Sequence, residues 1–105
     1  MYSVIETDVF AAWLAGLKDR MTRLRLQMRL RKASLGNLGD VSSVGDGVFE
    51  MREPFGPGWR MYFIHRNATL IVMLGGGDKS SQQRDIERAK KLALALKLQY
   101  EQEQE

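Results

Sequence analysis

The segment "LIVMLGGGDKSSQQRDIERAKK", residues 70–91, decides much of the fold because it joins an apolar strand to a charged helix. The apolar run at 70–74 indicates a buried strand. The glycines after it, at 75–77, predict either a simple chain reversal or a loop whose backbone approaches a phosphate group. Lys79 follows them at the start of the helix. We favour the second interpretation, in which Lys79 points at a phosphodiester.

This segment lacks the patterns of nucleotide-binding loops. The phosphate-loop motif G-x-x-x-x-G-K-[ST] is absent because Asp78 separates the glycines from Lys79. No βαβ unit surrounds the glycines, which excludes a dinucleotide fingerprint. Ser80 and Gln83 fit a capping box that would begin the last helix. The apolar stripe of that helix consists of Ile86, Ala89, Ala93, Leu96 and Tyr100.

The N-terminal part predicts a strand and two helices. Residues 2–6 alternate weakly and suggest a short strand, and Thr7 is a suitable N-cap for a helix from Asp8. Apolar residues recur there at helical spacing: Val9, Phe10, Trp13, Leu14 and Leu17. The stretch "RLRLQMRLR" alternates like a strand, but its residues are good helix formers, so we predict a second helix over 21–34.

The second helix is strongly basic. Residues 18–32 carry seven basic side chains against Asp19, a local charge of +6, while the chain as a whole carries +3. Such a patch suits an acidic partner, either nucleic acid or an acidic protein segment, or else is a solvated helix face. We predict that the Met and Leu stripe of this helix, which includes Met21, Leu24 and Met28, belongs to the core.

The middle of the chain predicts strands at 48–53, 59–65 and 69–74, with "PFGPG" at 54–58 as a hairpin loop. The order β-α-α-β-β-β-α makes an α+β fold with a mostly antiparallel sheet packed on helices. We expect one domain over residues 1–100 and a frayed acidic tail over 101–105.

Side-chain parity sorts the strand residues into two faces. Phe49 and Met51 share one face with the apolar set of the next strand, Trp59, Met61 and Phe63. The opposite face then collects Glu50, Arg52, Arg60 and Tyr62. We predict that the helices cover the apolar face and that these four residues form a functional surface, although Glu50 and Arg52 could simply pair with Arg60 across the strands.

Composition narrows the function classes. The 105 residues include no cysteine and one histidine, so we expect no thiol nucleophile and no metal site, and we expect no cofactor. The N-terminus has no basic region of the signal-peptide type, and no apolar run approaches a membrane span. We therefore expect a soluble cytoplasmic protein that does not contact the membrane.

The segments "FAAWLAGLKD", "GNLGD", "VGDGVFEMRE", "FGPGWRMYF" and "LGGGDKSSQQRDIERAKKLA" together resemble the phage-derived addiction-module killer proteins. These are HigB-type toxins of the RelE/ParE superfamily. The resemblance runs from about residue 8 to residue 93, with the segments in the family's order and spacing. Trp59 is a departure, since Tyr is commoner at that position.

The resemblance implies a RelE/ParE-like fold and the toxin role of a type II toxin–antitoxin system. The activity would be metal-independent endoribonuclease cleavage of mRNA on translating bacterial ribosomes, which inhibits translation. The implied partners are an antitoxin, often a helix-turn-helix protein, together with mRNA and the ribosome; operator DNA would be reached through the antitoxin. By motif position, Arg52, Arg60, Tyr62 and Lys79 match the charged and aromatic residues of the concave sheet face.

The chemistry of RNA cleavage assigns roles to these residues. Arg60 and Lys79 would stabilise charge on the phosphorane, Arg52 would bind an adjacent phosphate or hold Glu50, and Tyr62 would stack on a base or donate a proton. The general base stays open between Glu50, His65 and a substrate that the ribosome orients. Arg23, Arg29 and Arg31 are candidates for contacts with RNA phosphates, or this helix docks the antitoxin instead.

Two other functions compete with the nuclease. One is a non-enzymatic, ParE-like inhibitor that binds DNA gyrase. The other is an inactive toxin-fold co-repressor that acts together with its antitoxin. The gyrase inhibitor would not need Arg60 and Lys79 to lie near one phosphate.

Overall fold

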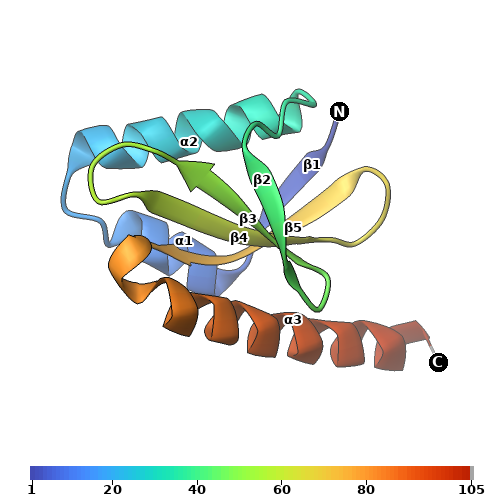
Figure 1. The fold of residues 1–105 in the computed structure, drawn as a ribbon. Coiled ribbons are helices and arrows are strands. Elements are labelled where there is room, and N and C mark those ends of the chain that lie inside the picture. Colours follow the sequence, from blue (N-terminus) through green and yellow to red (C-terminus); the bar gives the residue numbers. More distant parts are fainter. Residues whose placement is uncertain (105) are drawn as a thin grey trace.

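The computed structural model describes residues 1–104, and Figure 1 shows a sheet that lies between helices. The fold is α+β. The elements, in chain order, are β1 (Ser3–Glu6), α1 (Asp8–Ala15), α2 (Arg20–Ser34), β2 (Val41–Gly45), β3 (Val48–Glu53), β4 (Trp59–His65), β5 (Leu70–Gly77), a 3₁₀ turn (Lys79–Ser81) and α3 (Gln82–Gln104).

The five strands form one mixed sheet in the order β1-β5-β4-β3-β2. The pairs β2–β3, β3–β4 and β4–β5 are antiparallel, and β1 pairs in parallel with β5. The prediction of a mostly antiparallel sheet is confirmed. The prediction of β-α-α-β-β-β-α is incomplete, because β2 was missed.

β2 was missed because its sequence, "VSSVG", has no run of apolar residues. It pairs with β3 through a tight turn at Asp46 and Gly47, whose φ angles are 55° and 78°. An Asp-Gly pair is a strong signal for such a hairpin turn, since both turn positions need positive φ. The hairpin turn therefore brings β2 into register with β3, although the side chains of β2 bury little surface.

The first two helices agree with the prediction. Thr7 is the N-cap of α1, and its hydroxyl accepts a hydrogen bond from the backbone N–H of Phe10 at 3.1 Å. The segment "RLRLQMRLR" is helical despite its alternation, and Asp19 is the N-cap of α2. Side-chain capping satisfies backbone donors that the first helical turn would otherwise leave free.

The sheet has a core on each face (Figure 1). On one face, Phe10 and Leu14 of α1 and residues of α2 pack on the apolar set that parity predicted, which includes Met51, Met61 and Phe63. On the other face, Ala89 and Ala93 of α3 pack on Val48, Tyr62, Ile64 and Leu74. The prediction that the helices leave the second face free is therefore wrong: α3 covers it.

The inward face of α2 also differs from the prediction. Met21, Leu24 and Met28 are exposed, and the buried residues of this helix are Thr22, Leu26, Arg29, Leu30 and Ala33. The alternating sequence offers two apolar stripes. The buried one includes the small side chains of Thr22 and Ala33, and it brings Arg29 within reach of backbone carbonyls that need a donor.

Arg29 is the main polar anchor of α2. Its side chain is 8% exposed and donates hydrogen bonds to the backbone carbonyls of Leu38, Asp40 and Arg52. It also forms an ion pair with Glu53. A buried guanidinium is stable only when its donors are satisfied, and here it fixes the approach to β2 and the end of β3 to the helix.

The glycines at 75–77 are part of β5, which corrects the prediction of a loop. Gly75, Gly76 and Gly77 lie opposite Tyr62, Met61 and Arg60 of β4. None of the three has a positive φ, so the reason for glycine is space. A Cβ on Gly76 would lie 2.7 Å from the Cζ2 atom of Trp13, and one on Gly77 would lie 2.8 Å from the carboxyl carbon of Asp85.

The junction before α3 is capped by a different residue from the one predicted. The side chain of Asp78 accepts a hydrogen bond from the backbone N–H of Ser80 at 2.8 Å, so Ser80 and Gln83 form no capping box at this turn. α3 continues to Gln104, and Glu and Gln are good helix formers. The fraying of 101–105 stays a prediction. Glu105 lies outside the described residues. Within residues 1–104, every helix is too short or too polar to cross a bilayer.

We predict that Arg29→Met destabilises the fold by about 3–5 kcal/mol, because it leaves Glu53 and three carbonyls without their donor. Arg31→Met, on the exposed side of the same helix, is the matched control and changes the free energy of unfolding by less than about 0.5 kcal/mol. Urea unfolding followed by circular dichroism measures both. Equal effects of the two changes would refute the anchoring role.

We predict that Gly76→Ala costs about 1–3 kcal/mol of stability, because the new methyl group overlaps the Trp13 ring. At Gly75, a Cβ would meet no atom within 4 Å. Gly75→Ala is therefore neutral or stabilising by up to about 1 kcal/mol. The same unfolding experiment compares them, and a Gly76→Ala protein as stable as the Gly75→Ala protein would contradict the packing argument.

Candidate functional site

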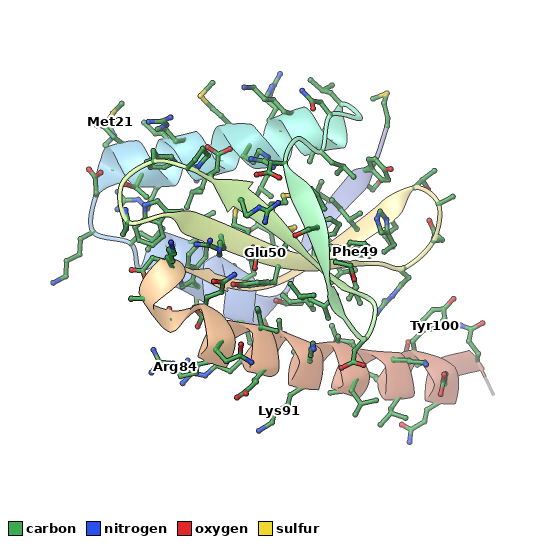
Figure 2. The ribbon with its side chains drawn as sticks, viewed as in Figure 1. Met21, Phe49, Glu50, Arg84, Lys91 and Tyr100 are labelled. Carbon is green, nitrogen blue, oxygen red and sulfur yellow. The ribbon has the colours of Figure 1, made fainter. Side chains whose placement is uncertain are left out.

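The residues that parity grouped do share one face of the sheet. Glu50 lies opposite Tyr62, and Arg52 lies opposite Arg60, in the register of β3 and β4. Because α3 covers this face, Tyr62 is 0% exposed and Glu50, labelled in Figure 2, is 2% exposed. The face is therefore a buried polar cluster with an open edge, rather than an exposed sheet surface.

Glu50 is held from two elements. Its Oε1 atom accepts a hydrogen bond from Nε of Arg60 on β4 at 3.2 Å, and its Oε2 atom accepts one from Nε2 of Gln82 at the start of α3, at 3.0 Å. Both carboxylate oxygens are thus occupied. Glu50 is built as a structural counter-ion, and its predicted use as a general base has no support in this geometry.

Tyr62 lies deeper in the same cluster. Its hydroxyl has no hydrogen-bond partner among the protein atoms of residues 1–104. Burial raises its pKa well above the ordinary value, and the charges of Glu50 and Asp85 raise it further, against the opposing effect of Arg60. The ring lies in the core with no exposed surface, and the predicted stacking on a nucleic-acid base stays a prediction.

Arg60 and Lys79 meet at the loop that joins β3 to β4. Nη1 of Arg60 donates to the carbonyl of Gly58 at 2.9 Å, and the backbone N–H of Lys79 donates to the carbonyl of Pro57 at 3.4 Å. Gly58 has a φ of 82°, and a Cβ there would lie 3.3 Å from Nη1 of Arg60 and 3.5 Å from Cβ of Lys79. The guanidinium of Arg60 and the base of the Lys79 side chain therefore lie on either side of one glycine.

The side chains of these two cations differ in exposure and in ion pairing. The side chain of Arg60 is 13% exposed and paired with Glu50, whereas Lys79 is exposed and forms no ion pair with any residue of 1–104. Asp78 lies close by: hydrogen bonds from Ser80 hold the pKa of its carboxyl below the usual range, and the charge of Arg60 adds to this effect. This part of the surface thus offers a guanidinium held by Glu50, an exposed ammonium group and a carboxylate.

Asp85 and Ser81 are not among the site residues predicted from the sequence. The hydroxyl of Ser81 donates to Oδ2 of Asp85 at 2.5 Å, directly over Gly77. This contact ties the 3₁₀ turn to the first turn of α3. Gln82, which holds Glu50, gave no separate signal in the sequence, because glutamine at a helix start is ordinary.

Arg52 forms its side-chain contacts with a different residue, although it lies opposite Arg60 in the sheet. Its guanidinium forms a two-bond ion pair with Asp40, with distances of 2.8 and 3.2 Å. This pair lowers the pKa of Asp40 and raises that of Arg52. Arg52 therefore anchors the residue before β2, and it does not hold Glu50.

The three arginines predicted to bind RNA have different surroundings in the structure. Arg29 is buried in the anchor described above, and Nη1 of Arg23 donates to the carbonyl of Leu17. Arg31 is exposed. Arg25 lies over the ring of Phe55 at 3.9 Å from its centroid, a cation–π contact.

His65 lies on the same face of the sheet as Phe63. Its exposed ring packs against Tyr2, Phe49 and Phe63, with centroid distances of 5.8, 5.3 and 5.5 Å. It therefore lies on the sheet face opposite to Glu50 and cannot act as a base beside Arg60.

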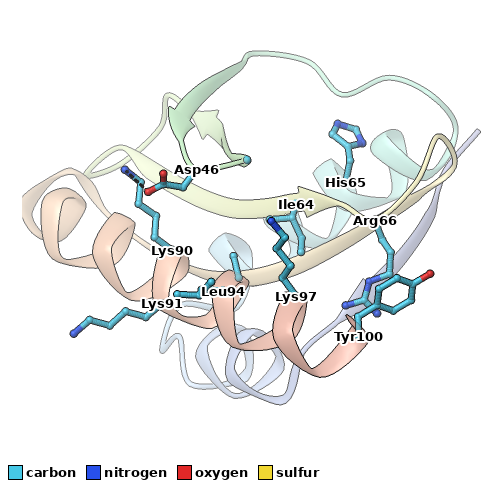
Figure 3. Close-up of a pocket in the computed structure, with 11 residues that line it drawn as sticks. Asp46, Ile64, His65, Arg66, Lys90, Lys91, Leu94, Lys97 and Tyr100 are labelled. Carbon is cyan, nitrogen blue, oxygen red and sulfur yellow. Dashed lines mark ion pairs between the residues drawn. The ribbon is translucent and has the colours of Figure 1, made fainter. Parts of the chain in front are cut away.

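A groove of about 820 Å³ lies farther along α3, away from Arg60 and Lys79 (Figure 3). Its floor includes Ile64 and Leu94, and its rim carries basic side chains; His65 points away from it in the figure. The lining residues are Asp46, Gly47, Ile64, His65, Arg66, Lys90, Lys91, Ala93, Leu94, Lys97 and Tyr100. Lys90 pairs with Asp46 at 3.7 Å.

The glycine strand lines a second, smaller groove, of about 410 Å³, between α1 and α3. Gly75 and Gly76 form its base, and Trp13, Asp85 and Arg88 are among its walls. Arg88 had no place in the predicted site. Within residues 1–104, no cluster of three His, Cys, Asp or Glu side chains has the arrangement of a metal site.

The chain is 42% identical to an uncharacterized protein of Haemophilus influenzae over 92 residues. The aligned region covers 88% of this chain and 93% of the Haemophilus protein. No protein-family model matches the sequence.

We predict that Tyr62→Phe leaves the free energy of unfolding unchanged or raises it by up to about 1 kcal/mol, because the lost hydroxyl has no protein partner. Tyr100→Phe, which removes a hydroxyl from a tyrosine that is 43% exposed, is the matched control. Urea unfolding compares the two. A loss of more than about 1 kcal/mol for Tyr62→Phe alone would show that the hydroxyl is bound.

Proposed function

The chain belongs to the same family as this Haemophilus influenzae protein, and from its site we propose that it is the toxin of a type II toxin–antitoxin system, with a RelE/ParE-like fold. In this proposal it cleaves mRNA on translating ribosomes in the bacterial cytoplasm. A helix-turn-helix antitoxin neutralises it and carries it to operator DNA. The observation that supports the proposal is the convergence of Arg60 and Lys79 at Gly58.

The arrangement suits a phosphodiester. Glu50 and the Gly58 carbonyl orient the guanidinium of Arg60, so little reorganisation is needed when charge develops on the phosphorane. Lys79 adds an exposed ammonium group that reaches a phosphate from the solvent side. Gly58 keeps the loop backbone close to both side chains, since any Cβ would crowd Arg60.

The roles then divide between the protein and the ribosome. The ribose 2′-oxygen attacks phosphorus, the bond to the 5′-oxygen breaks, and Lys79 supplies the proton that the leaving oxygen takes. Arg60 stabilises the non-bridging oxygens. Glu50 and Tyr62 are engaged or buried, so in this proposal the 2′-hydroxyl proton passes to a water molecule while the ribosome holds the 2′-oxygen in line for attack.

A second candidate is an inhibitor that acts by binding, such as a gyrase-binding protein or an inactive co-repressor. The observation that favours it is that Glu50, Arg52 and Tyr62 are all committed to contacts or burial inside the protein. Such a protein would use its surface and would tolerate loss of Lys79.

We predict that Lys79→Ala lowers mRNA cleavage by about 10²–10³-fold, because it removes a charge that acts in the transition state. The chain is induced alone in bacteria, and growth and message integrity are measured. The matched control is Lys97→Ala, which changes an exposed lysine of α3 and leaves cleavage unchanged. Circular dichroism verifies that each variant folds.

The other outcomes separate the alternatives. Arrested growth without cuts, unaffected by Lys79→Ala, would replace the nuclease with an inhibitor that acts by binding. Normal growth with the folded wild-type chain would refute the toxin proposal. Equal loss of cleavage in both lysine variants would refute the assignment of Lys79.

A further inference from the structure

α2 and its C-cap residue, Leu35, expose a row of large apolar side chains, although helices of soluble proteins usually bury them. Met21, Leu24, Met28 and Leu35 are 63%, 40%, 59% and 62% exposed. In Figure 2, Met21 points away from the sheet, on the outer side of α2. We name these four residues the α2 seam. The inner face of the helix is already filled by Leu26, Leu30 and Ala33, so the seam has no partner within residues 1–104.

The spacing of the α2 seam follows a heptad pattern. Met21, Leu24 and Met28 are separated by three and four residues, and Leu35 lies one heptad after Met28. In coiled-coil terms they occupy positions a, d, a and a, and Arg31 stands at the second d position. This spacing keeps side chains on one stripe that fits the side of another helix.

The residues beside the α2 seam carry positive charge. Positions e and g are Arg20, Arg25, Gln27, Lys32 and Ser34. No carboxylate stands among them, and the nearby Asp19 is occupied as the N-cap, where it accepts from Thr22 at 2.7 Å. Because these flanking positions choose the partner in paired helices, a fitting helix carries acidic residues there.

We propose that the α2 seam docks an acidic amphipathic helix of a partner protein, with apolar residues at its a and d positions and glutamates at e and g. One glutamate would face Arg31. A second copy of this chain fits poorly, because pairing α2 with itself would place Arg and Lys opposite one another. The inference is independent of the nuclease proposal, since the α2 seam involves neither Arg60 nor Lys79.

An RNA partner explains these features less well. The centre of the surface is apolar, which phosphates do not require. Arg23 and Arg29 of the same helix are engaged with backbone carbonyls, so the basic row has fewer free charges than the sequence indicates. Apolar anchors at helical spacing between charged flanks are the mark of helix recognition.

The test uses a synthetic three-heptad peptide with Ile at a, Leu at d and Glu at e and g. NMR chemical-shift mapping on the full chain locates the site, and titration gives the affinity. We expect shifts along α2 and binding at least ~10-fold tighter than that of the same peptide with Lys at e and g. Salt weakens this binding.

Paired variants isolate the apolar contact without changing charge. Met28→Ser lowers the affinity for the acidic peptide by at least ~10-fold, because it removes a central apolar anchor. Leu94→Ser removes a residue of similar exposure, 57%, from α3 and leaves the affinity unchanged. Both side chains are exposed, so both variants fold, and circular dichroism verifies it.

Four results would overturn the proposal. They are equal binding of the acidic and basic peptides, shifts that map to the groove on α3, and equal effects of Met28→Ser and Leu94→Ser. The fourth is that Met28→Ser leaves the peptide affinity the same but abolishes another interaction of the chain. That interaction is either self-association, measured by sedimentation, or binding of a single-stranded RNA oligonucleotide. These readouts use no cleavage activity, so they stand apart from the toxin test.

Discussion

The close packing at two successive glycines holds the two helical layers to the sheet. Gly76 gives its side-chain space to the Trp13 ring of α1 on one face, and Gly77 gives its space to the carboxylate of Asp85 of α3 on the other. Any larger residue would push a helix away from β5. The start of α3 therefore lies against the sheet, where Gln82 reaches Glu50 and Ser81 reaches Asp85. The polar cluster forms because Gly77 lets the start of α3 come close to the sheet.

The cluster and the basic helix show how buried charge is used in this chain. Glu50 and Arg29 are both nearly inaccessible, and each is surrounded by partners that satisfy it. Removing water from such groups is costly, so their hydrogen bonds fix the positions of neighbouring elements. Arg29 ties α2 to the sheet, while Glu50 orients Arg60. Lys79 is exposed, and the base of its side chain lies beside Gly58 and the guanidinium of Arg60.

Local signals predicted most of the elements. The N-cap at Thr7, the helical nature of "RLRLQMRLR" and the strands β3 and β4 followed from propensity and parity, and the structure confirms them. β2 escaped because its strand character comes from a turn at Asp46 and Gly47, and its side chains show little pattern. The glycines of β5 were interpreted as a loop because sequence alone cannot tell a glycine chosen for flexibility from one chosen for lack of volume.

The sequence by itself determined the α+β class, the faces on which Glu50, Arg60 and Tyr62 lie, and the basic character of α2, since these depend on side-chain period and charge. Only the tertiary structure decided which groups are accessible. The sheet has two faces to bury, and α3 covers the one that parity left free, so Tyr62 became core and Glu50 a counter-ion. Likewise α2 could bury either of two apolar stripes, and Arg29, which needed the carbonyls of its neighbours, selected one and left Met21, Leu24 and Met28 outside.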